Sequence, residues 1–91
     1  MKSVRIRVEG RVQGVGYRAW VERMASSAGL SGWVRNRADG SVEAVFQGGD
    51  IRVSEMIARC ETGPSAASVT NVEVFDEAGG AFTGFEIRPT S

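Results

Sequence analysis

The chain has 91 residues, the size of one domain, and its composition excludes several kinds of chemistry. It has no histidine and a single cysteine, Cys60, so we expect no internal disulfide, no cysteine-based zinc site and no nucleophile activated by histidine. Eleven basic residues balance eleven acidic ones, which argues against a general polyanion-binding protein. We therefore expect one domain over residues 1–91, with no metal site and no nucleic acid as partner.

The charge is distributed unevenly along the chain. Residues 1–40 carry a net charge of +5, and residues 41–91 carry a net charge of −5. Two interpretations are open: the two halves attract each other in the fold, or the positive half attracts an anionic substrate.

The first residues show the alternation of a strand. Val4, Ile6 and Val8 alternate with charged residues, which predicts a strand over residues 4–9 with one buried face. The same alternation offers no continuous apolar stretch for a signal peptide or a membrane span. We therefore expect a cytoplasmic protein that does not contact a membrane.

A glycine-rich loop and a helix follow the first strand. Glycines stand at positions 10, 14 and 16, and apolar residues at helical spacing predict a helix over residues 18–30. The remainder is predicted to form a hairpin with the turn Asp39-Gly40, a helix with Asp50 as N-cap, and two more strands. These elements cover residues 32–37, 41–47, 50–62, 69–75 and 82–88.

The order of these elements predicts an α+β fold. The order βαββαβ is typical of a ferredoxin-like sandwich, in which two helices cover one face of an antiparallel sheet. In this topology the first two strands run parallel with the third between them, so the glycine loop and Asn36 become neighbours. The second strand is placed at the sheet edge, where its charges discourage pairing with another chain, and we therefore expect a monomer.

The loop between the first strand and the helix has the features of a phosphate-binding site. Glycine allows the backbone to approach a ligand closely, and N–H groups at a helix N-terminus favour an anion. Arg18 adds a guanidinium whose planar shape matches phosphate oxygens. We assign phosphate binding to Gln13, Gly14, Val15, Gly16, Tyr17 and Arg18. The spacing alone leaves a purely structural turn equally open.

Two other phosphate motifs do not fit. Residues 14–19 match the dinucleotide pattern G-x-G-x-x-A, but the strand ends several residues too early and the chain is too short for the usual double sheet. The nucleoside triphosphate loop requires a lysine before Ser or Thr, and Lys2 is the only lysine in the chain.

Two longer segments resemble the signature segments of the acylphosphatase family. They are residues 10–18 (GRVQGVGYR) and residues 32–48 (GWVRNRADGSVEAVFQG). Residues 63–69 and 84–87 are also similar to the family, so the resemblance covers essentially the whole chain.

This resemblance implies hydrolysis of the carboxyl–phosphate bond of small acyl phosphates, without a metal or other cofactor. It implies that Arg18 binds the phosphoryl oxygens and that Asn36 orients the attacking water. Inorganic phosphate would be both a product and a competitive inhibitor.

Other readings of the same residues stay open. Taken singly, Arg18 fits a helix-surface arginine and Asn36 a turn residue. A non-catalytic ferredoxin-like module that binds RNA or a regulatory anion is the main alternative function. A carbamoyl-transfer or maturation component is a third, since domains resembling this one occur within larger proteins.

The remaining conspicuous side chains are interpreted as structural. We expect Arg35 and Arg37 to be solvated strand charges and Cys60 to be buried on the second helix. Five aromatic residues are expected to pack in the core or on the sheet: Trp20, Trp33, Phe46, Phe75 and Phe85.

Overall fold

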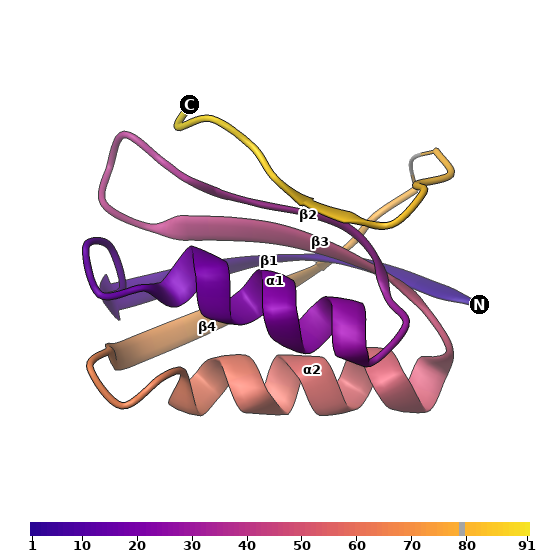
Figure 1. Ribbon diagram of the computed structural model, residues 1–91, viewed down its shortest axis with the longest axis horizontal. Helices are drawn as coiled ribbons and strands as arrows, with labels where there is room; N and C mark the ends of the chain where they lie inside the picture. Colours follow the sequence, from indigo (N-terminus) through magenta and orange to yellow (C-terminus); the bar gives the residue numbers. More distant parts are fainter. Residues whose placement is uncertain (79) are drawn as a thin grey trace.

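Five strands and two helices are formed by the residues that the computed structural model describes, which are 1–78 and 80–91 (Figure 1). In chain order the elements are β1 (Lys2–Arg11), α1 (Tyr17–Ser27), β2 (Ser31–Asn36), β3 (Val42–Gly48), α2 (Asp50–Thr62), β4 (Ser68–Asp76) and β5 (Phe85–Ile87). No helix of this described part is long and apolar enough to cross a membrane.

The central part of the sheet has the predicted arrangement. The strand order is β4-β1-β3-β2-β5, and β3 pairs antiparallel with both β1 and β2. The strands β1 and β2 therefore run parallel with β3 between them. Both helices lie on one side of this sheet, with α1 against β2 and β5 and α2 against β1 and β4 (Figure 1). This arrangement confirms the predicted α+β ferredoxin-like sandwich.

The position of β5 corrects two predictions. This strand crosses from the edge at β4 to the opposite edge and pairs parallel with β2, so the sheet is mixed rather than wholly antiparallel. The edges are thus formed by β4 and β5, and β2 is an interior strand. The prediction of a monomer loses the argument that placed β2 at an edge, and it stays a prediction.

The ends of the helices also differ from the sequence-based bounds. The first helix ends at Ser27, because Gly29 adopts a left-handed φ of 72° and Leu30 N–H donates to the Ala25 carbonyl oxygen at 2.9 Å. This hydrogen bond and that of Gly29 N–H to Ser26 form a Schellman motif, which stops the helix. At the second helix the N-cap is Gly49, and Asp50, which was expected there, is the first helical residue.

The core lies between the sheet and the helices. The side chains of Val4, Ile6 and Val8 are at most 1% exposed, and these residues pair with Phe46, Ala44 and Val42 of β3. Cys60 of α2 is fully buried in the same cluster, as predicted, and burial raises the pKa of its thiol to about 12. The alternation seen in the first residues thus directs one face of β1 into the core.

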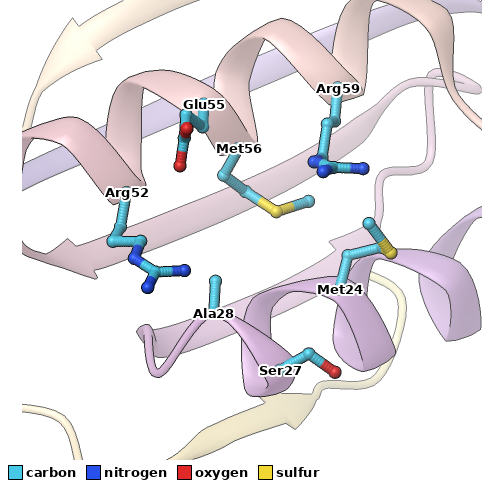
Figure 2. A pocket seen from close by; sticks show the side chains of 7 residues that line it. All are labelled: Met24, Ser27, Ala28, Arg52, Glu55, Met56 and Arg59. Carbon is cyan, nitrogen blue, oxygen red and sulfur yellow. The ribbon is translucent and has the colours of Figure 1, made fainter.

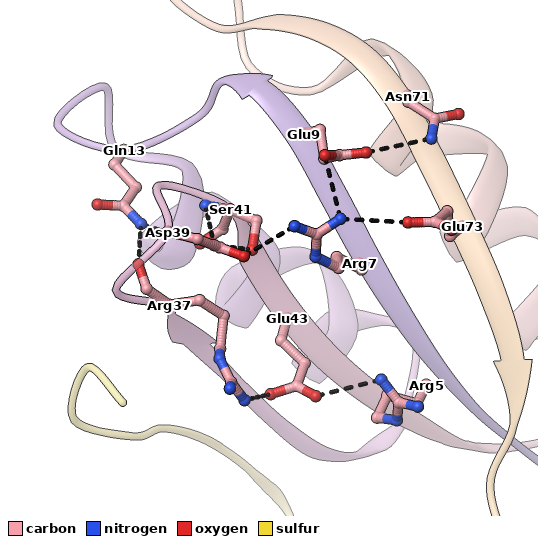
Figure 3. Close-up of polar contacts among 10 residues, drawn as sticks. All are labelled: Arg5, Arg7, Glu9, Gln13, Arg37, Asp39, Ser41, Glu43, Asn71 and Glu73. Atoms are coloured by element: carbon pink, nitrogen blue, oxygen red, sulfur yellow. Dashed lines mark hydrogen bonds and ion pairs between the residues drawn. The ribbon is translucent and has the colours of Figure 1, made fainter.

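The opposite face of the sheet carries a network of ion pairs centred on Glu43 (Figure 3). Its carboxylate accepts hydrogen bonds from Arg35 Nε at 2.9 Å, Arg37 Nη1 at 2.8 Å and Arg5 Nη1 at 3.3 Å. Burial alone would raise the pKa of Glu43, but the hydrogen bonds from Arg35 and Arg37 outweigh it and hold the pKa below its ordinary value. The prediction that Arg35 and Arg37 are merely solvated charges is wrong.

Aromatic side chains on this face lie against arginines. The Trp33 ring is 7% exposed and lies 4.8 Å from the guanidinium of Arg35 and 4.9 Å from that of Arg88. Phe75 on the edge strand β4 stays 37% exposed beneath Arg5, with 4.5 Å between guanidinium and ring centroid. Trp33 is therefore packed as expected, whereas Phe75 is only partly covered by a cation–π contact.

The Glu43→Gln variant tests the network. It replaces a carboxylate that three arginines share, and we expect it to lower the free energy of unfolding at pH 7 by roughly 1–3 kcal/mol. The pKa of Glu43 is lowered by folding, so its contribution is present above the ordinary pKa and is lost as the pH falls through the lowered value.

Urea denaturation followed by tryptophan fluorescence from pH 7 to pH 3 measures this effect. The difference between wild type and Glu43→Gln should shrink below about pH 4.5. The matched control is Glu86→Gln, whose carboxylate pairs with Arg88 in an exposed position. Equal, pH-independent losses in the two variants would contradict a special role of Glu43.

Candidate active site

The loop between β1 and α1 contains two glycines in the left-handed region. Gly14 has a φ of 73° and Gly16 a φ of 79°, and a Cβ atom on either residue would meet no other atom within 4 Å. The backbone conformation therefore requires glycine here, because other residues adopt such φ angles at a cost. Close contact with a ligand, the reason expected from the sequence, is not needed to explain the two glycines.

The N-terminus of α1 offers backbone donors to the same loop. Gly16 is the N-cap and receives no side-chain cap hydrogen bond. The first N–H group bonded within the helix is that of Trp20, which donates to the Gly16 carbonyl oxygen at 3.0 Å. The N–H groups of residues 16–19 therefore have no partner within the helix, and they lie at the positive end of its dipole.

Gln13 connects this loop to the turn between β2 and β3 (Figure 3). Its side-chain Nε2 donates to the carbonyl oxygens of Arg37 at 2.8 Å and Ser41 at 2.9 Å. Both amide hydrogens are thereby used within the protein. The Gln13 side chain thus fixes the position of the loop, whereas the sequence assigned this residue to phosphate.

The side chain of Tyr17 has a structural role, and its backbone N–H group is one of those without a partner in the helix. The ring is 1% exposed, and its hydroxyl donates to the carbonyl oxygen of Cys60 on α2 at 2.7 Å. Burial raises the pKa of this hydroxyl well above its ordinary value. Tyr17 therefore anchors the start of α1 to α2, and only its N–H group is free to meet a ligand.

Asn36 is the last residue of β2 and lies next to the loop. It is 9% exposed, and its side-chain Oδ1 is buried without a hydrogen-bond partner among the described residues. Asn36 and Val8 both pair with Val42 of β3, one on each side, so Asn36 lies two strands away from the end of β1. A buried amide oxygen without a partner is costly unless water or a ligand donates to it.

Arg18 is the cation of the first turn of α1. Its side chain is partly exposed and forms no ion pair with any residue that the structure describes. The guanidinium can therefore meet an anion without first leaving a carboxylate.

One cleft of about 230 Å³ brings most of the predicted site residues together. Its lining includes five of them, namely Gly14, Gly16, Tyr17, Arg18 and Asn36, together with Val12, Ala19 and Ile87. Gln13 and Val15 do not line it; Val15 packs partly against the core.

Sequence reasoning missed Val12, Ala19 and Ile87 as lining residues. Val12 and Ala19 flank the predicted loop and were within reach of the same argument. Nothing in the sequence around Ile87 indicates that it lines the cleft, because its position depends on the pairing of β5 with β2.

A second hollow, of about 150 Å³, lies between the two helices (Figure 2). Met24 of α1 and Met56 of α2 extend into it from the two helices, and Arg52 and Arg59 line it from α2. It contains none of the predicted site residues. Within the described part of the chain, no three His, Cys, Asp or Glu side chains come together as metal ligands.

The Gln13→Ala variant tests the role of the loop attachment. It removes two hydrogen bonds that hold the loop. The loop must then become ordered when phosphate binds, and the cost of this ordering should lower the affinity for inorganic phosphate roughly five- to tenfold. Isothermal titration with phosphate measures this. The matched control is Gln47→Ala, which removes an amide that donates to Gly80 away from the cleft. Equal phosphate affinities of Gln13→Ala and wild type would contradict the attachment.

The Tyr17→Phe variant separates stability from binding. It leaves the buried Cys60 carbonyl oxygen without its donor, so we expect a loss of about 1–2 kcal/mol in the free energy of unfolding. The affinity for inorganic phosphate should stay within twofold of wild type, because the hydroxyl that the variant removes is bonded to Cys60 on α2 and lies in a buried side chain. Thermal denaturation and phosphate titration on the same samples test both statements, and weakened binding with unchanged stability would disprove them.

Comparison with known proteins shows the family to which the chain belongs. The family model described as Acylphosphatase matches residues 4–87. An acylphosphatase of Rhizorhabdus wittichii is 55% identical over 94% of this chain and 87% of its own length. One from Rhodospirillum rubrum is 44% identical over 99% of both chains.

A solved structure shows the same fold. The crystal structure of an acylphosphatase from Bacillus subtilis matches with a TM-score of 0.92 and 35% identity, covering 97% of this chain and 99% of that chain. The chain therefore belongs to the acylphosphatase family.

Proposed function

We propose that this protein hydrolyses the carboxyl–phosphate bond of small acyl phosphates, giving a carboxylate and inorganic phosphate. The observation that carries the proposal is the meeting of Arg18, the first N–H groups of α1 and Asn36 in one cleft. Membership of the acylphosphatase family supports the same reaction. The RNA- or anion-binding alternative is not favoured.

The phosphate group is bound by the loop and α1 in this proposal. The N–H groups of residues 16–19 donate to its oxygens, and the Arg18 guanidinium binds two of them with its planar pair of donors. The N–H donors are part of the backbone of α1, so they need little rearrangement when the substrate binds.

The same donors stabilise the transition state. A loose, metaphosphate-like transition state carries its charge on the peripheral oxygens, where fixed dipoles and a guanidinium act most strongly. Water attacks phosphorus, the bond from phosphorus to the acyl oxygen breaks, and the carboxylate leaves with the electron pair. The proton of the attacking water passes to a phosphate oxygen of the substrate. No step requires a metal or a cofactor.

Asn36 positions the attacking water. Its amide does not act as a base at neutral pH, but its buried Oδ1 is an acceptor without a partner among the described residues. A water that donates to this oxygen satisfies the buried acceptor and is held close to the phosphate. The role of Asn36 is therefore orientation, and that of Arg18 is charge stabilisation.

Arg18→Ala and Asn36→Ala test these assignments in a phosphate-release assay with acetyl phosphate and carbamoyl phosphate. Loss of Arg18 should lower kcat/KM by at least about 10²- to 10³-fold, as for loss of a main oxyanion donor. Asn36→Ala should lower kcat more than it weakens inhibition by inorganic phosphate, which we expect to be competitive.

The matched control is Arg23→Ala, which removes an exposed arginine of the same helix that does not line the cleft. Retained activity in Arg18→Ala would overturn the proposed site. Absence of hydrolysis in the wild type, together with salt-dependent RNA binding, would favour the binding-module alternative.

A further inference from the structure

The cleft has an apolar side that the phosphate chemistry does not use. Ile87 pairs with Val34 in the parallel ladder between β5 and β2, so both side chains lie on the face of the sheet that the helices cover. Val34 is fully buried, whereas Ile87 is 44% exposed and lines the cleft. A large aliphatic side chain is therefore exposed beside Arg18 and Asn36.

The packing of β5 explains how Ile87 reaches this position. Phe85, two residues earlier on the same face, stacks on Phe46 with 5.7 Å between ring centroids and closes the core there. Two residues further along the strand, Ile87 lines the cleft together with Ala19, which lies in the first turn of α1. The apolar face of β5 thus continues from the core into the candidate active site.

The cleft is far larger than the space that one water molecule needs. Its volume of about 230 Å³ is many times the roughly 10–15 Å³ needed to hold one water. The polar donors come from residues 16–19 and Asn36, and the apolar side is formed by Val12, Ala19 and Ile87. A ligand with a phosphate at one end and an apolar group at the other matches this division.

We propose that Ile87, together with Ala19, contacts the acyl group of the substrate and makes the enzyme prefer acyl phosphates with longer apolar acyl chains. This inference rests on the proposed function. The contact is the same in the ground state and in the transition state, so it lowers KM more than it raises kcat. Ile87 is a specificity-determining residue here, and it takes no part in the chemical step.

Acetyl phosphate and butyryl phosphate test this preference. Their leaving carboxylates are closely similar, so the ratio of kcat/KM values reports the contact made by the two additional methylenes. Full burial of one methylene raises kcat/KM about fourfold. We expect a butyryl preference of about three- to tenfold, because Ile87 and Ala19 cover only one side of the acyl chain. Ile87→Thr keeps the β-branched shape suited to a strand and should bring the ratio below about twofold. Ile87→Val should retain the preference.

The matched control is Val74→Thr, because Val74 is 49% exposed on β4, the opposite edge of the sheet. Its butyryl-to-acetyl ratio should equal that of the wild type, and inhibition by inorganic phosphate should be unchanged in all variants.

Three results would overturn the proposal. A ratio unaffected by Ile87→Thr, or lowered equally by Val74→Thr, overturns only the role of Ile87. Hydrolysis of neither substrate by the wild type overturns the proposed function as well.

Discussion

The central strand β3 determines where the groups of the candidate active site meet. It pairs antiparallel with β1 on one side and with β2 on the other, so both of those strands end at the same end of the sheet. Val42 is the shared partner of Val8 and Asn36, which fixes how far apart the two strand ends lie. A slip of one residue in the pairing of β2 with β3 would turn Asn36 to the charged face, away from the loop, and a slip of β1 against β3 would expose the buried valines of β1.

The turn between β2 and β3 is held from both sides of the sheet. On the charged face, Arg7 Nη2 donates to Asp39 Oδ2 at 2.7 Å, and Asp39 Oδ1 accepts hydrogen bonds from the N–H group and the hydroxyl of Ser41 (Figure 3). The Ser41 carbonyl oxygen in turn accepts a hydrogen bond from Gln13 of the loop. The pKa of Asp39 is lowered chiefly by the Ser41 hydroxyl and by Arg7. A continuous set of hydrogen bonds therefore connects the ion pairs of the sheet to the loop between β1 and α1.

Local patterns in the sequence predicted the elements and the polar half of the site, and long-range pairing decided the rest. The alternation in β1 and the turn at Asp39-Gly40 depend only on neighbouring residues, so the sequence predicts both. The side chains of Gln13 and Tyr17 find partners 24 to 43 residues away, which no spacing within the loop reveals. The position of β5 in the sheet could not be predicted either, because the sequence of a short strand does not indicate which edge of the sheet it joins. This one uncertainty misplaced β2 at an edge and left Ile87 out of the site.

The uneven charge of the chain has a structural explanation in the network of ion pairs. Glu43 pairs with Arg5, Arg35 and Arg37, and Glu77 also pairs with Arg5, so much of the positive charge of the first half is neutralised by carboxylates of the second half. These ion pairs favour the interpretation that the two halves attract each other over the interpretation that the positive half attracts an anionic substrate. Arg18 differs from these arginines because it forms no ion pair with the described residues and lines the cleft. In the proposed function, selection among anions would depend on the N–H groups and the guanidinium at the start of α1, and selection among acyl groups on Ile87 of the edge strand β5.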